Sequence, residues 1–157
     1  AWRRGAGQLA GAGGDPGEAL RVRTGEAIER ARPAVEGAYG QHIFSGDINS
    51  NGIPTGFHSK SDGSATHETY GTTTPLGSGV YQQSVRLSGG NRARKPVQST
   101  FFPDAASHDT VIGAIAAVHK VGLSTVAYVD PSVNGLKLIK KGDTVFPSGG
   151  SDTRLAE

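Results

Sequence analysis

The chain contains no cysteine, and this absence excludes disulfide bonds, thiolate metal ligands and a cysteine nucleophile. No stretch approaches the roughly 18 consecutive apolar residues of a membrane span, so we expect no transmembrane helix. The N-terminus also lacks the apolar run of a signal peptide, and we expect any export to use another route or a larger parent chain. A fold without cysteine is indifferent to redox compartment, which suits a protein that passes between compartments.

The composition indicates a turn-rich domain with an appendage. Of the 157 residues, 24 are glycine and 35% are apolar, which predicts one modest core. Residues 1–37 are expected to form a linker or a marginal N-terminal helix that ends near Pro33, because the apolar stripe among the charged residues is thin. Residues 38–157 then form the folded domain. The net charge of +2 permits an anionic partner but does not argue strongly for one.

The pattern of strands and turns begins at about Gly40. A helix is expected from an N-cap at Ser107 to Gly122, because apolar residues recur there with helical spacing. The polar segment Ser59–Ser78 is expected to be a long loop. Apolar runs bounded by turn residues predict strands over Val80–Leu87, Arg92–Phe102, Thr125–Val129 and Leu136–Lys140. The sequence therefore predicts an α+β fold, mainly antiparallel β-sheet with a packed helix.

A predicted hairpin between His42 and His58 carries a histidine at each outer end. Its two apolar arms predict short strands, and Asn51-Gly52 between them is a strong turn signal. A two-residue turn would place the histidines on opposite faces. A three-residue loop with Gly52 in the left-handed conformation would place them on one face, about 7 to 8 Å apart along the backbone. On spacing alone, two unrelated histidines are the simpler interpretation.

Two further stretches carry polar side chains that could act beside such a pair. Lys95 and Ser99 are four residues apart in an expected strand and share a face, so they could offer a charge to a phosphate and a hydroxyl to a base. An edge-strand lysine that prevents aggregation is the simpler interpretation of Lys95 taken alone. Thr144 and Phe146 also share a face, and alone they are typical of an ordinary strand end.

Taken together, these stretches resemble the EndoU endoribonucleases. The resemblance covers about Gly40 to Ser148 and is strongest for bacterial members found as C-terminal toxin domains of polymorphic and contact-dependent inhibition proteins. It is carried by His42, Gly56-Phe57-His58, Lys95-Pro96-Val97-Gln98-Ser99-Thr100-Phe101-Phe102-Pro103-Asp104 and Thr144-Val145-Phe146-Pro147. It implies a barnase/EndoU/colicin/RelE-like ribonuclease fold for residues 38–157.

The resemblance also implies roles for individual residues. His42 and His58 match the two catalytic histidines of the family, with His58 as general base and His42 as general acid. Lys95 matches the catalytic lysine, and Ser99 matches a serine associated with uridine preference. Thr144 matches a threonine that would help to stabilise developing charge.

Phe146 departs from the family pattern, where a tyrosine is found. The phenyl ring of Phe146 can still stack on a base and bind substrate in that way. It cannot donate a hydrogen bond as a phenol does, so a role that needs the hydroxyl is not expected here.

The implied activity is metal-independent cleavage of RNA by its own 2'-hydroxyl, which gives a 2',3'-cyclic phosphate and a free 5'-hydroxyl. Histidine suits both proton transfers because it titrates near neutral pH, and no cofactor is required. The expected target is tRNA or a single-stranded loop, where a base can be splayed and stacked. The resemblance further implies a cognate immunity protein, acidic where it covers the cleft, and delivery as part of a larger secreted or cell-surface toxin to the target-cell cytoplasm.

Three alternatives remain open at this point. The domain could be an inactive RNA-binding module of the same fold, a ribonuclease of another cyclising family, or a metal hydrolase. The metal hydrolase would use His42, His58 and His67, but the chain offers no short-spaced pair of ligands. His67 is otherwise expected to be solvated in its polar loop.

Overall fold

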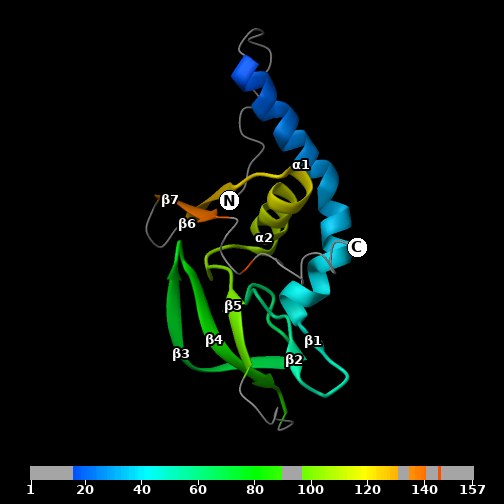
Figure 1. The fold of residues 1–157 in the computed structure, drawn as a ribbon, viewed down its shortest axis with the longest axis vertical. Coiled ribbons are helices and arrows are strands. Elements are labelled where there is room, and N and C mark those ends of the chain that lie inside the picture. Colours follow the sequence, from blue (N-terminus) through cyan, green and yellow to red (C-terminus); the bar gives the residue numbers. More distant parts are fainter. Residues whose placement is uncertain (1–15, 90–96, 131–134, 141–144, 146–157) are drawn as a thin grey trace.

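The structure, a computed structural model, describes residues 16–89, 97–130, 135–140 and 145 (Figure 1). These residues form an α+β fold with antiparallel sheets, which confirms the predicted fold class. The elements in chain order are α1 (Pro16–Gly40), the π-helical segment η2 (Gln41–Ser45), β1 (Asp47–Ile48), β2 (Pro54–Thr55), β3 (His67–Gly77), β4 (Val80–Leu87), β5 (Val97–Phe101), α2 (His108–Ile115), the π-helical segment η3 (Ala116–Val121), β6 (Thr125–Asp130) and β7 (Gly135–Lys140). None of the helices in the described ranges is both long and apolar enough to cross a membrane.

Helix α1 is longer than the sequence predicts and does not end near Pro33. It continues through this proline to Gly40 and leads directly into η2. Ile28, Val35 and Tyr39 are each at most 1% exposed and pack in the same core cluster as α2. This burial stabilises the helix and offsets the backbone hydrogen bond that Pro33 cannot donate. The helix passes through the expected domain boundary at residues 37 and 38, and that boundary remains a prediction.

The central sheet has the order β3–β4–β5, and all its neighbours are antiparallel. The strand predicted over Val80–Leu87 is confirmed with the same ends. The loop predicted over Ser59–Ser78 is wrong for its second half, which forms β3. Threonine and tyrosine in this stretch favour extended backbone, and pairing with β4 completes its hydrogen bonds. A two-residue turn, Ser78-Gly79, with positive φ at both residues joins β3 to β4.

Helix α2 begins as predicted at the N-cap Ser107, whose Oγ accepts a hydrogen bond from the backbone N–H of Thr110. It continues as η3 to Val121 and ends at Gly122, which is left-handed. The side chains of Val111, Ile112 and their neighbours fill the core between α1 and the rest of the domain. The hairpin predicted near the end is confirmed as β6 and β7, and the predicted strand Arg92–Phe102 is represented by β5 within the described residues.

The end of α1 leads through η2 toward the sheet. In Figure 1, α2 and the β6–β7 hairpin lie above the β3–β4–β5 sheet, and α1 runs down one side to η2 and the β1–β2 hairpin. Segment η2 and the β1–β2 hairpin therefore lie between the helical core and the edge of the sheet that carries β5. Both histidines of the predicted hairpin lie in this region.

Candidate active site

His42 is held at the end of a helix, not in a strand. The prediction that residues 42–48 form one strand of a hairpin is wrong, because His42 lies in η2 and pairing begins only at Asp47. Ile43 and Phe44 are both buried, and Ile43 lies four residues after the buried Tyr39. Packing of consecutive apolar side chains into the helical core favours continued helix over a strand, which would turn them to opposite faces.

The hairpin itself exists but is short. Its pairs are Asp47 with Thr55 and Ile48 with Pro54, so five residues connect the strands, not the two or three that were considered. The side-chain oxygen of Asn49 accepts hydrogen bonds from the backbone N–H groups of Asn51 and Ile53 and closes the loop. Gly52 has φ +76, which agrees with the predicted left-handed conformation.

His58 follows the hairpin and is clamped between η2 and β5. The backbone N–H of Phe57 donates to the carbonyl of His42 at 2.7 Å, and that of His58 donates to the carbonyl of Ile43 at 2.7 Å. On the other side, the carbonyl of His58 accepts from the N–H of Phe102. Phe57 has φ +64, a conformation that costs on the order of 1 kcal/mol for a residue with a side chain and is maintained by these bonds and by its burial.

The two imidazoles lie side by side, with ring centroids 5.2 Å apart and planes inclined by 46°. The structure therefore brings together the two residues that spacing alone left unrelated. It does so through a helix end and the irregular segment after the hairpin, instead of two paired strands. Both residues as a whole have intermediate exposure, and the side chain of His42 is 20% exposed.

The hydrogen bonds of His58 fix its tautomer. Its Nδ1 lies 2.7 Å from the carbonyl oxygen of Thr100, which can only accept, so Nδ1 carries the proton and Nε2 carries the lone pair in the neutral ring. The pKa of His58 is lowered to about 4, because burial disfavours the charged ring and His42 adds repulsion, while the bond to Thr100 opposes the shift. Neutral His58 at pH 7 has the form that a general base requires.

His42 has a different partner. Its Nδ1 lies 2.9 Å from Oδ2 of Asp47, and the other carboxylate oxygen, Oδ1, accepts from the side-chain amide of Gln41 at 3.1 Å. The backbone of Asp47 is also fixed, since its carbonyl oxygen lies 2.9 Å from Nε2 of His67. Asp47 was not predicted as a site residue. A strand from residue 42 to residue 48 would have placed it on the face opposite His42, whereas the helix end turns it toward the ring.

Ser99 lies beside His58, on β5. Its hydroxyl donates to the carbonyl of Phe57 at 2.8 Å and lies 3.3 Å from Nδ1 of His58. The residue is only 5% exposed. This geometry holds the His58 segment against the sheet. The role of Ser99 in base preference stays a prediction.

Lys60 is a second residue that the sequence did not single out. Its ammonium donates to the side-chain oxygen of Gln83 at 2.6 Å and lies 5.1 Å from the ring centroids of both Tyr81 and Phe101. Lys60 comes two residues after His58, and this closeness in sequence is the one feature that could have indicated a position at the site. The predicted residues Lys95, Thr144 and Phe146 lie outside the described residues.

His67 is not solvated as predicted, because it is 2% exposed and packs near the ring of Phe57. Its Nδ1 lies 2.7 Å from the hydroxyl of Thr66, and its Nε2 faces the carbonyl of Asp47. Both nitrogens therefore have protein partners, which makes His67 a structural residue beneath the hairpin. In the described part of the chain, no three His, Cys, Asp or Glu side chains converge as metal ligands.

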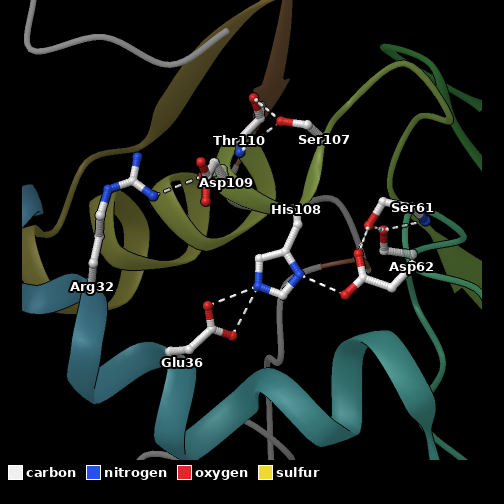
Figure 2. Close-up of polar contacts among 9 residues, drawn as sticks. Arg32, Glu36, Ser61, Asp62, Ser107, His108, Asp109 and Thr110 are labelled. Carbon is white, nitrogen blue, oxygen red and sulfur yellow. Dashed lines mark hydrogen bonds and ion pairs between the residues drawn. The ribbon is translucent and has the colours of Figure 1, made fainter.

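A polar cluster around His108 braces the same region (Figure 2). Nδ1 of His108 lies 2.7 Å from Asp62, in the segment after His58, and Nε2 lies 2.7 and 2.9 Å from the two carboxylate oxygens of Glu36 on α1. Partial burial lowers the pKa of His108, but the hydrogen bonds and charges of Glu36 and Asp62 outweigh burial and raise it. The ring also stacks on Phe44 at 3.9 Å, so the cluster ties α1, η2 and α2 to the segment that carries His58.

Two adjacent histidines with different partners have the means to give a proton to a substrate and to take one from it. In a comparison with protein families, the model for bacterial EndoU nucleases matches residues 37–138. The chain therefore belongs to the bacterial EndoU nuclease family, and its substrate is a nucleic acid. No curated protein and no solved structure matches the chain significantly.

Proposed function

We propose that this nuclease is a metal-independent endoribonuclease that cleaves RNA through its own 2'-hydroxyl. The observation that carries the proposal is the pair of imidazoles 5.2 Å apart with different partners. His58 acts as general base: its Nε2 takes the proton of the 2'-hydroxyl, whose oxygen attacks the adjacent phosphorus. His42 acts as general acid: its Nε2 gives a proton to the departing 5'-oxygen. The products are a 2',3'-cyclic phosphate and a 5'-hydroxyl.

The two environments support this division of roles. The lowered pKa of His58 keeps Nε2 free to accept a proton at neutral pH. The carboxylate of Asp47 accepts the Nδ1–H of His42 and orients the ring, so that a proton on Nε2 is the one presented to the leaving group. The family resemblance adds Lys95 and Thr144 as groups that stabilise the charge of the phosphorane, and Ser99 and Phe146 as contacts to the base.

The biological setting in this proposal is bacterial competition. The domain acts as the toxin of a larger secreted or cell-surface protein, enters the cytoplasm of a target cell and cuts tRNA or single-stranded loops there. A cognate immunity protein protects the producer by covering the cleft, and acidic residues on its surface favour rapid capture of the basic site. The resemblance to toxin domains of contact-dependent inhibition proteins supports this setting.

The test is an end-mapping assay. Purified protein is incubated with total tRNA and with a single-stranded oligoribonucleotide in EDTA, and the cleaved ends are characterised and sequenced. We expect 5'-hydroxyl ends, and 3' ends that resist ligation until the cyclic phosphate is opened and the resulting phosphate is removed. His42→Ala and His58→Ala should each lose at least about 10²-fold in rate. The control is His108→Gln, which removes an imidazole outside the pair and should keep its activity below its melting temperature.

Each alternative predicts a different result. RNA binding without cleavage in any buffer would identify an inactive RNA-binding module. Cleavage that EDTA abolishes and zinc restores would identify a metal hydrolase. Linear 3'-phosphate or 3'-hydroxyl ends formed without a cyclic intermediate would exclude the proposed chemistry.

A further inference from the structure

A cavity of about 350 Å³ opens at the end of the central sheet where β3 turns into β4. Its size is at the lower end of the range for small-molecule sites. One wall is the second half of β3, including Pro75 and Gly77, and the other is the start of β4, including Gly79 and Tyr81. The carboxylate of Asp104, in the segment after β5, also lines it.

The wall formed by the β3–β4 turn is closely packed at Gly79. Gly77, Ser78 and Gly79 have φ values of +101, +56 and +82, and a side chain at Gly79 would meet the hydroxyl of Tyr128 at 2.7 Å. The register of β3 against β4 also shifts on both sides of Thr74 and Pro75. Strand irregularities of this kind are over-represented at sheet edges and next to functional sites.

The chemistry of the cavity is that of a base site. Tyr81 supplies an aromatic ring, and its hydroxyl donates to Oδ1 of Asp104. The Tyr81 ring also stacks on Phe101 with centroids 5.3 Å apart, which fixes its plane. A carboxylate repels phosphate but accepts hydrogen bonds from the amino groups of bases.

Lys60 connects the surroundings of His58 to one wall of this cavity. His58 bonds to the backbone of Thr100 and Phe102, on either side of Phe101, and Phe101 pairs with Tyr81 of β4. Lys60 follows His58 by two residues and reaches β4, since its ammonium is bonded to Gln83 and lies over the ring of Tyr81. An RNA strand that crosses from the histidine pair to β4 would therefore meet a cation first and an aromatic ring next, the arrangement of a single-strand binding site.

We infer that the cavity beside Tyr81 and Asp104 binds the base of a nucleotide that flanks the cleaved bond, with Lys60 contacting the phosphate between the two positions. This inference rests on the proposed cleavage of RNA. Asp104 selects a base with an exocyclic amino group (cytosine, adenine or guanine) and disfavours uracil, which carries none. This flanking position is separate from the base next to the histidines.

The first test measures preference at each position around the cut. A single-stranded RNA library with random positions on both sides of the cut is cleaved by wild type, by Asp104→Asn and by the matched control Asp109→Asn, and the ends are sequenced. We expect wild type and the control to favour amino-bearing bases over uracil at one flanking position by at least about 5-fold, within the range of a single lost base contact. Asp104→Asn should reduce this ratio to less than half. Equal ratios in wild type and Asp104→Asn would overturn the inference while leaving the proposed function intact.

The second test does not depend on catalysis. Cytidine 5'-monophosphate and uridine 5'-monophosphate are titrated separately into the protein, and backbone amide shifts are followed by NMR. We expect cytidine monophosphate to shift the amides of residues 73–81 and 104 with at least 3-fold tighter binding than uridine monophosphate, and Tyr81→Leu to abolish those shifts. Tyr81→Phe should retain them, which separates loss of the ring from loss of the fold. Nucleotide shifts confined to the residues around His58 would overturn the inference, and a wild-type protein that binds here but cuts no RNA would overturn only the proposed function.

Discussion

Oδ2 of Asp47 lies 2.9 Å from Nδ1 of His42, and the same carboxylate is steadied by the amide of Gln41. Since a carboxylate can only accept, the nitrogen that faces it carries a proton, and the opposite nitrogen, Nε2, is left for the substrate. Asp47 is therefore a positioning residue for His42. It acts through the ring and touches no reacting atom itself.

Asp47→Asn should lower kcat by roughly 10²-fold or more and leave KM within about 3-fold, because the amide is neutral and does not stabilise the doubly protonated ring that a general acid needs. Asp109→Asn removes a carboxylate at an exposed position and should change neither constant. Both variants should melt within a few degrees of wild type. Equal losses in the two variants, or a rise in KM with kcat unchanged, would exclude the positioning role.

The pKa of His58, about 4, predicts the acidic limb of the activity profile. The profile of kcat/KM against pH reports the free enzyme, so activity should fall with a midpoint near pH 4, not near the ordinary 6.5 of histidine. Melting curves at each pH must show that the protein remains folded. A midpoint near 6.5 would contradict His58 as the buried neutral base.

The same shift also predicts a stability change. Between pH 6.5 and pH 4 the unfolded chain binds a proton at residue 58 that the folded chain does not. The contribution of His58 is therefore present above pH 6.5 and is lost as the pH falls to 4, by up to about 3 kcal/mol. Urea unfolding of wild type and His58→Gln at pH 7 and pH 4.5 measures it: the difference between the proteins should move in favour of the glutamine variant at the lower pH.

Gly56 approaches His42 so closely that no side chain fits. A Cβ at Gly56 would collide with the carbonyl oxygen of His42 and lie 2.9 Å from its Nδ1, and φ at Gly56 is +73. Gly56→Ala should therefore displace His42 and reduce both activity and stability. Gly52→Ala is the matched control, because Gly52 has nearly the same φ, +76, with open space around it. That variant should cost only about 1 kcal/mol of backbone strain and keep its activity. Equal effects of the two substitutions would show that contact with His42 is unimportant.

The hydroxyl of Ser99 could serve either of two roles, and substitution of this residue distinguishes them. If it chiefly holds the His58 segment, Ser99→Ala leaves the buried carbonyl of Phe57 without its donor, costs about 1–2 kcal/mol of stability and lowers kcat. If it chiefly reads a base, the substitution changes base preference at the cut and leaves stability nearly unchanged. Ser84→Ala on the neighbouring strand, where the hydroxyl pairs with Gln98 in an exposed position, should do neither. Urea unfolding and cut-site sequencing decide between the two.

The sequence predicts the turn near the two histidines but not the backbone that carries His42. Asn51-Gly52 and the apolar arms predict a turn that returns the chain, and the turn exists. These local features do not reveal that Ile43 and Phe44 pack in the helical core with Tyr39 and its neighbours. For this reason the prediction of a strand at His42 is wrong. His67 is buried by partners as distant as Asp47, twenty residues away, and a polar local sequence carries no trace of that contact. The run Val80–Leu87 was predicted with correct ends because its alternation is local and strong.

The cluster around His108 predicts stability that is lost at alkaline pH. Its folded pKa is raised above the unfolded value, so its contribution is complete below pH 6.5 and disappears as the pH rises through the raised value. His108 is 33% exposed, and its partners Glu36 and Asp62 are 48% and 41% exposed, so screening limits the effect to about 1 kcal/mol.

His108→Gln keeps a polar side chain but cannot carry the charge. The melting temperature of the variant should change little between pH 6 and pH 9. The melting temperature of wild type should exceed it at pH 6, and this difference should shrink as the pH rises to 9. Glu36→Gln, which removes one of the two facing carboxylates, should halve that advantage at pH 6, because Asp62 still faces the ring. A wild-type advantage that stays constant from pH 6 to pH 9 would show that the ring contributes by stacking on Phe44 and not by its charge. An advantage that grows has the wrong sign for a positively charged His108.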